Sequence, residues 1–262
     1  TWQEIDEAGD PVCRRDGTGK WPLACREVAL VAGGDLGGIS GVSLTLMEAT
    51  GLDVSLLYDP LDRDIFLFGL ALTVALSVVT VAGGIGLGVL FGWLMHRRTP
   101  VAAAFLQALC ATLRMTPPLL QLYIVFFGFG GVVLALGFSL DAFTVASVVL
   151  SFYAAASNAV AFALAADVAA GEGGRLGFRI AEIRHAFGLC HAAVMGNSVN
   201  IVKATGMAST LALPELVHAS TAIVAEKGND DVMMNLLLIC YFVLVIVTVQ
   251  IFRLWERRSR AP

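Results

Sequence analysis

Charged side chains are absent from four long stretches of this 262-residue sequence: Ile65–Met95, Met115–Leu140, Ala142–Ala166 and Val232–Phe252. Each stretch exceeds the roughly 20 apolar residues that a helix needs to cross about 30 Å of hydrocarbon. Because the bilayer core offers the backbone no water, such stretches must cross it as helices. With 57% hydrophobic residues and a mean hydropathy of +0.79, the composition excludes an ordinary soluble domain.

The patterns that mark metal sites and hydrolytic active sites are also missing. There is no CxxC and no Cys/His cluster at ligand spacing, and His185 and His191 are six positions apart, off the spacing of a helical metal pair. No Ser/His/Asp set, carboxylate pair or phosphate-binding glycine loop stands out. We therefore expect no enzyme activity of the chain's own, no metal, no cofactor and no nucleic-acid partner.

The five cysteines fall into two groups. Cys110, Cys190 and Cys240 lie in or beside apolar stretches, where we expect small buried thiols. Cys13 and Cys25 lie in the polar N-terminal segment. If that segment is extracytoplasmic a disulfide between them is one alternative, and two free thiols are the other.

The N-terminal residues differ in charge from the rest. Residues 1–64 contain twelve acidic and five basic residues, a net charge of −7, whereas the remainder contains nine acidic and twelve basic residues, a net charge of +3. The sequence starts at Thr1 without the apolar core of a signal peptide, so we expect a processed chain or part of a longer one. We predict a polar N-terminal segment over residues 1–63 and a membrane domain over residues 64–258.

Arginine clusters orient the membrane domain, because cytoplasmic loops of membrane proteins are rich in Lys and Arg. The clusters are Arg97 and Arg98; Arg175, Arg179 and Arg184; and Arg253, Arg257, Arg258 and Arg260. All lie on one side if Ala192–Leu213 forms a further span. This predicts an all-α polytopic bundle of five transmembrane helices, with the N-terminal segment outside and the C-terminus in the cytoplasm.

The predicted fourth span contains polar groups that a lipid anchor would avoid. Lys203 interrupts it, Asn197 dilutes it, and Pro214 and Glu215 end it. A charge at membrane depth is costly and normally faces a bundle interior or a wet cavity. The segment therefore suggests a pathway, although a snorkelling Lys203 and a helix-end Glu215 are alternatives.

Two local patterns predict how the other spans pack and bend. Gly84, Gly88 and Gly92 recur every four residues, which predicts close approach of a neighbouring helix. Thr116-Pro117-Pro118 should break or kink the second span. Asn158 and Asn197 are expected to form interhelical hydrogen bonds.

Between the third and fourth spans, Phe178–Leu189 alternates apolar and charged residues with helical periodicity. This predicts a short amphipathic helix on the cytoplasmic side. It is either a docking helix for a partner or a helix lying on the membrane surface.

Three passages resemble the inner-membrane permease subunits of bacterial ABC importers for polar amino acids (the histidine, glutamate, glutamine, arginine and opine type). Phe66–Thr73 (FLFGLALT) is similar to the family's F-L-x-G-L-x-x-T, and Arg114–Gln121 (RMTPPLLQ) to its R-G-T-P-L-L-V-Q. Asn197–Leu216 follows N-x-x-x-x-x-L-K-D-T-S-L-A-S-x-x-x-x-P-E-L. In Glu182–Gly188 (EIRHAFG) the family's E-A-A-x-x-x-G keeps its first and last residues, but Ile and Arg replace both alanines.

The resemblance implies a type I ABC importer permease that pairs with an identical or homologous permease subunit in the bacterial inner membrane. An ATPase dimer would dock on a coupling helix near residues 175–189, and an extracytoplasmic substrate-binding protein would deliver the cargo. The implied substrate-path candidates are Lys203, Thr205, Glu215, Asn197, Arg114, Thr116 and Gln121. The implied coupling residues are Glu182, Ile183, Phe187 and Gly188. A secondary transporter or channel, and a non-transporting membrane scaffold that retains the permease fold, remain as alternatives.

Overall fold

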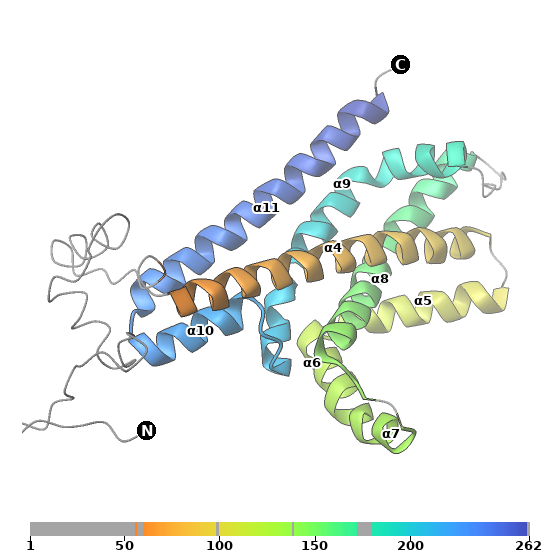
Figure 1. Ribbon diagram of the computed structural model, residues 1–262. Coiled ribbons are helices and arrows are strands. Elements are labelled where there is room, and N and C mark those ends of the chain that lie inside the picture. Colours follow the sequence, from red (N-terminus) through yellow and green to blue (C-terminus); the bar gives the residue numbers. More distant parts are fainter. Residues whose placement is uncertain (1–55, 57–59, 98–99, 138, 172–179, 261–262) are drawn as a thin grey trace, which may run out of the picture.

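The computed structural model describes residue 56 and residues 60–97, 100–137, 139–171 and 180–260 (Figure 1). The regular structure of these residues is helical throughout, which confirms the all-α prediction. The predicted N-terminal segment with Cys13 and Cys25, and the loop residues Arg175 and Arg179, lie outside the described residues.

The centre of the bundle is the pair formed by α4 (Pro60–His96) and α8 (Ala142–Ala170), which cross in contact with each other (Figure 1). A Cβ atom added to Gly84 or Gly88 would lie 2.5 Å from the Cβ of Ala154 or Asn158, respectively. One added to Gly92 would lie 2.6 Å from the carbonyl oxygen of Ala159. The glycine spacing thus predicted this close helix approach correctly.

The second predicted span is divided into short pieces. The sequence did not predict α5 (Pro100–Met115), an apolar helix that packs on α8 and buries Leu106 and Cys110. After the predicted break at Thr116-Pro117-Pro118 come α6 (Pro118–Tyr123), the π-helical turn η2 (Ile124–Gly128) and α7 (Phe129–Ala135). The candidate span is Pro118–Ala135, shorter than the predicted Met115–Leu140.

The fourth span is broken. Its parts are α9 (Ile180–Ala204), the 3₁₀ helix η3 (Thr205–Leu211) and α10 (Leu216–Lys227), and the chain bends by 53° between η3 and α10. The stretch Phe178–Leu189 was predicted as a short amphipathic helix, and from Ile180 onward these residues are helical and form the first part of α9, which continues to Ala204. Gly188 does not end the helix, and its Cα faces open space.

The last span, α11 (Asp230–Arg260), lies at the edge of the bundle and packs on α9 and α10 (Figure 1). In its most apolar 18 residues only 6% are buried, and large side chains such as Leu238 and Phe242 are exposed. Such a surface suits lipid or another membrane subunit, not water. The described residues contain four helices long and apolar enough to span, or five if the bent pair is one span. The protein is therefore an all-α membrane protein.

Candidate functional site

The break in the fourth span is held by an unusual backbone turn. Ala212 has φ 56°, in the left-handed region, and it closes η3 by donating its N–H to the carbonyl of Ser209. A non-glycine residue is strained there, because its Cβ crowds the following carbonyl oxygen. The turn reverses into Pro214 and Glu215, from which α10 starts.

Glu215 is fully buried and caps α10. Its Oε1 accepts from the backbone N–H groups of Val217 and His218, at 3.0 and 3.1 Å. Its Oε2 lies 3.2 Å from the hydroxyl of Thr73 on α4 and 3.3 Å from that of Tyr241 on α11. The carboxylate thus joins the N-terminus of α10 to two other spans, and all its protein partners are hydrogen-bond donors.

Thr73 can reach the Glu215 carboxylate because α4 and α10 approach each other very closely. A Cβ on Gly69 would lie 2.8 Å from the Cβ of Ala219 and 3.1 Å from the Glu215 carbonyl oxygen, so only glycine fits without a shift. The Thr73 oxygen also accepts from the N–H of Leu216 at 2.9 Å. Gly69 and Thr73 both belong to the passage FLFGLALT, whose glycine and threonine now have a structural role.

Beside this cap lies a groove of about 950 Å³ between η3, α10 and α11. Its polar lining residues are Lys203, Asn235 and Tyr241. The other lining residues are mostly apolar: Gly206, Met207, Val217, Met234, Leu237, Leu238, Phe242 and Val245. The groove is therefore an apolar trough with a small set of polar groups, which is the usual make-up of a small-molecule site.

Lys203 is the charged residue among those that line the groove. Its side chain is exposed at the C-terminal end of α9, and within the described residues it forms no hydrogen bond or ion pair. On α11 the groove reaches from Met234 to Val245, which includes Phe242 at the midpoint of the predicted span Val232–Phe252. An ammonium at that depth needs water or an anion beside it.

The amides predicted to bond between helices do so. Asn197 on α9 donates from Nδ2 to Oδ1 of Asn158 on α8 at 2.9 Å, and Asn158 donates in turn to the carbonyl of Gly84 on α4 at 3.1 Å. Thr205, the first residue of η3, is buried and donates to the carbonyl of Val202 in the last turn of α9. Neither Asn197 nor Thr205 lines the groove.

The candidates from the second span form a separate group. The Gln121 amide nitrogen lies 2.7 Å from the Leu113 carbonyl, 3.0 Å from that of Thr116 and 2.7 Å from the Thr116 hydroxyl. It caps the end of α5 across the proline break. Arg114 is exposed at that end of α5. Lys203 thus lines the same groove as Tyr241, which contacts Glu215, whereas Arg114, Thr116 and Gln121 do not line the groove.

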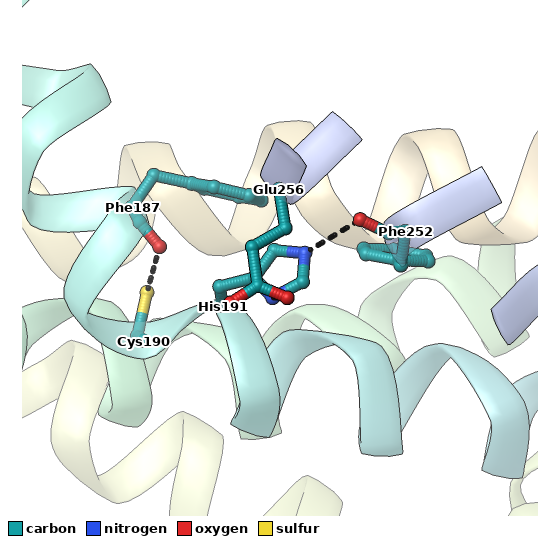
Figure 2. A network of polar contacts seen from close by, with 5 residues as sticks. All are labelled: Phe187, Cys190, His191, Phe252 and Glu256. Carbon is teal, nitrogen blue, oxygen red and sulfur yellow. Dashed lines mark hydrogen bonds and ion pairs between the residues drawn. The ribbon is translucent and has the colours of Figure 1, made fainter. Parts of the chain in front are cut away.

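Of the coupling candidates, Phe187 lies beside the C-terminal part of α11 (Figure 2). The Phe187 ring meets the Trp255 ring edge to face, with centroids 4.9 Å apart. The His191 ring stacks on Trp255, and its Nε2 lies 3.1 Å from the carbonyl oxygen of Phe252 (Figure 2). Because a carbonyl only accepts, Nε2 carries the proton. Cys190 is buried and donates to the Phe187 carbonyl.

Among the other coupling candidates, Ile183 packs into the same apolar cluster as Phe187, and Glu182 is half-buried. By contrast, Arg184, His185, Gly188 and Leu189 are exposed. The surface open to a partner in this part of α9 is therefore offered by one coupling candidate, Gly188, and by Arg184, His185 and Leu189, which were not coupling candidates.

Sequence reasoning also missed Tyr241, Asn235 and Trp255. Tyr241 is a hydroxyl-bearing ring within an otherwise apolar run, where a buried hydroxyl needs a partner. That signal was visible in the sequence, but the partner, Glu215, was not.

The fold has a counterpart of known structure. A crystal structure of an amino acid ABC transporter with histidines matches this chain with a TM-score of 0.62 and 19% sequence identity. The match covers 82% of this chain and 98% of that chain. No protein-family model matches the sequence, and no curated protein does either. At this identity the likeness concerns the fold: the chain has the all-α membrane architecture of an amino acid ABC transporter chain.

Proposed function

We propose that this chain is the permease subunit of an ATP-driven ABC importer in the bacterial inner membrane, with polar amino acids as its class of cargo. The observation that carries the proposal is the fold match, which extends over almost the whole of the transporter chain. The broken fourth span and the groove at Lys203 support it, since a transport path needs polar groups and irregular backbone at membrane depth.

In this proposal the chain pairs with a second permease subunit, identical or homologous. A substrate-binding protein docks on the extracytoplasmic side, and the C-terminus lies in the cytoplasm. ATP is hydrolysed by a partner ATPase dimer, and its closure alternates the access of a path that passes Lys203. The cap formed by Glu215, Thr73 and Tyr241 holds the break in the fourth span while the bundle moves.

The ATPase would dock where α9 starts. Since Ile183 and Phe187 pack inward, the contact falls to the exposed face that carries Arg184, His185 and Leu189, together with the preceding loop. Leu189, at 52% exposure, is the apolar residue on that face. An exposed apolar side chain among polar neighbours fits a helix that binds a groove in a partner.

The test is purification from native membranes in mild detergent, with mass spectrometry of all proteins that accompany the chain. We expect an ABC ATPase with the wild-type chain and its loss with Leu189→Asp. The control is Val101→Asp in the first turn of α5, which also places a carboxylate at an exposed apolar residue and should retain the ATPase. Purification without any ATPase would contradict the proposal.

One observation favours a second candidate, a non-transporting membrane scaffold that keeps the permease fold. The stretch Glu182–Gly188 is continuous with α9, and two of its predicted coupling side chains pack against other parts of the bundle. A scaffold would co-purify with other membrane proteins but with no ATPase, so the same experiment separates the two functions.

A further inference from the structure

The groove between η3, α10 and α11 has a charge distribution that points to one class of ligand. We propose that it binds an organic carboxylate with an apolar body, with the carboxylate on Lys203, and that it rejects cations. The proposal does not rest on the function proposed above, and it assigns a ligand to the groove without making that ligand the transported cargo.

The positive charge in the groove is the ammonium group of Lys203. Lys203 lines the groove, and within the described residues it has no hydrogen-bond or ion-pair partner. Its ammonium lies beside an apolar wall, where interactions between charges are screened less than in water. An anionic group in the groove would supply the partner that the protein does not.

Among its described lining residues, the groove offers no negative charge to a positively charged ligand. None of the described residues that line the groove is acidic. The carboxylate of Glu215 is within reach of Tyr241, which does line it, but Glu215 is itself fully buried. Both of its oxygens already face donors on α4, α10 and α11. A ligand ammonium or guanidinium would therefore meet Lys203 without a compensating charge.

The walls define the rest of the ligand. Met207, Leu238 and Phe242 are exposed apolar side chains that line the groove, and Met side chains adapt to ligands of different shape. The volume of about 950 Å³ is large enough for a small aromatic or branched acid with room to spare. The Asn235 amide, also in the lining, donates one N–H to the Asp231 carbonyl at 2.7 Å, and its second N–H can donate to a ligand carboxylate.

The groove should distinguish ligands of similar shape by their charge. A neutral amide of the same shape loses the ion pair, and arginine adds a repelled charge, so both should bind more weakly than the acid. Like-charge contact in a poorly solvated site is a common device for excluding a ligand.

The test uses the whole chain in lipid nanodiscs, with a fluorinated phenylpropionate as the probe and fluorine NMR as the readout. We expect saturable binding of the acid, and at least about tenfold weaker binding of the corresponding amide and of arginine in competition. Lys203→Met should lower the affinity for the acid about tenfold and leave the amide unchanged, whereas Lys203→Arg should retain binding. Arg253→Met on the exposed surface of α11 removes one positive charge elsewhere and should have no effect.

A second variant tests whether the probe binds in the groove without changing the charge of the groove. Leu238→Trp fills the groove from α11 and should abolish binding, while thermal unfolding checks that each variant is folded. Equal affinity for acid and amide, tighter binding of arginine, or binding unaffected by Lys203→Met would overturn the proposal. So would native mass spectrometry that finds a phospholipid held by the wild type and lost in Lys203→Met, because the groove would then be a lipid site.

The importer function and the carboxylate ligand of the groove can be disproved independently of each other. If an ATPase co-purifies but the probe does not bind, only the ligand assignment is wrong. If the probe binds as expected and no ATPase is found, the groove is a carboxylate site in a protein that is not an ABC importer.

Discussion

The hydroxyl of Thr73 lies 3.2 Å from the Glu215 carboxylate, so the first membrane helix is bonded directly to the break in the fourth. The two residues are 142 positions apart, and Tyr241 brings a third helix to the same oxygen. Any motion that widens the groove must either carry α4, α10 and α11 together or break this contact. We expect the three helices to move as a unit.

Removal of the Glu215 carboxylate should therefore destabilise the bundle. Glu215→Ala leaves the N–H groups of Val217 and His218 and the Tyr241 hydroxyl without this acceptor, whereas the Thr73 hydroxyl keeps the Gly69 carbonyl at 3.0 Å. We expect a loss of about 2 kcal/mol in the free energy of unfolding, measured by denaturant titration in micelles. The control is Glu226→Ala at an exposed site on the same helix, which should change little. Equal effects of the two variants would show that the cap carries no stability.

The glycine contact between α4 and α8 offers a pair of variants two residues apart, on opposite faces of α4. A Cβ on Gly84 would lie 2.5 Å from that of Ala154, whereas one on Gly86 meets nothing within 4 Å. Gly84→Ala should destabilise by about 1–3 kcal/mol through overpacking. Gly86→Ala should be neutral or stabilise by about 0.5–1 kcal/mol, because alanine loses less backbone entropy in a helix. Thermal unfolding of both variants checks the sign, and destabilisation by both would contradict the packing.

The amide chain from Asn197 through Asn158 to Gly84 should behave as a coupled unit. A double-mutant cycle with Asn158→Ala and Asn197→Ala should give a coupling energy of about 0.6–1.7 kcal/mol, the range found for hydrogen bonds inside membrane proteins. Alanine keeps the Cβ of Asn158 that packs on Gly88. Strictly additive effects in the cycle would mean that the two amides do not interact.

Substitution of Phe187 should lower the stability of the protein, whereas substitution of Leu189 should affect ATPase binding without changing stability. Phe187→Asp places a carboxylate against the Trp255 ring and should lower the free energy of unfolding by about 1–3 kcal/mol. Leu189→Asp, at an exposed position, should leave stability unchanged. Unfolding curves of both proteins in the same detergent decide this; a stable Phe187→Asp variant would contradict the inward packing.

The sequence predicted the parts of this fold that depend on local chemistry. Long runs without charge located the spans, the proline pair located the break after Met115, and glycines at every fourth position located the closest helix pair. These features act over a few residues or along one helix face, so a single sequence contains them.

Other features of the fold depend on contacts between residues that are far apart in the sequence. The stretch Phe178–Leu189 was predicted as a short amphipathic helix from its alternation of apolar and charged residues. It continues as α9 because one glycine costs a helix only about 1 kcal/mol, and Phe187 packs on Trp255 of α11. Likewise, Glu215 was predicted either to contact a substrate or to be a carboxylate at a helix end, and the structure makes it the N-cap of α10, with its second oxygen against Thr73 and Tyr241. Neither contact is visible without the tertiary structure.

The central claim is that this chain forms the path of an ATP-driven importer, and uptake by proteoliposomes tests it most directly. The complex purified with its ATPase would be reconstituted with a substrate-binding protein, and the accumulation of a labelled amino acid mixture measured with ATP and with a non-hydrolysable analogue. The account predicts accumulation against a gradient with ATP only. Equal movement of solute without ATP hydrolysis would contradict it and favour a secondary transporter or channel.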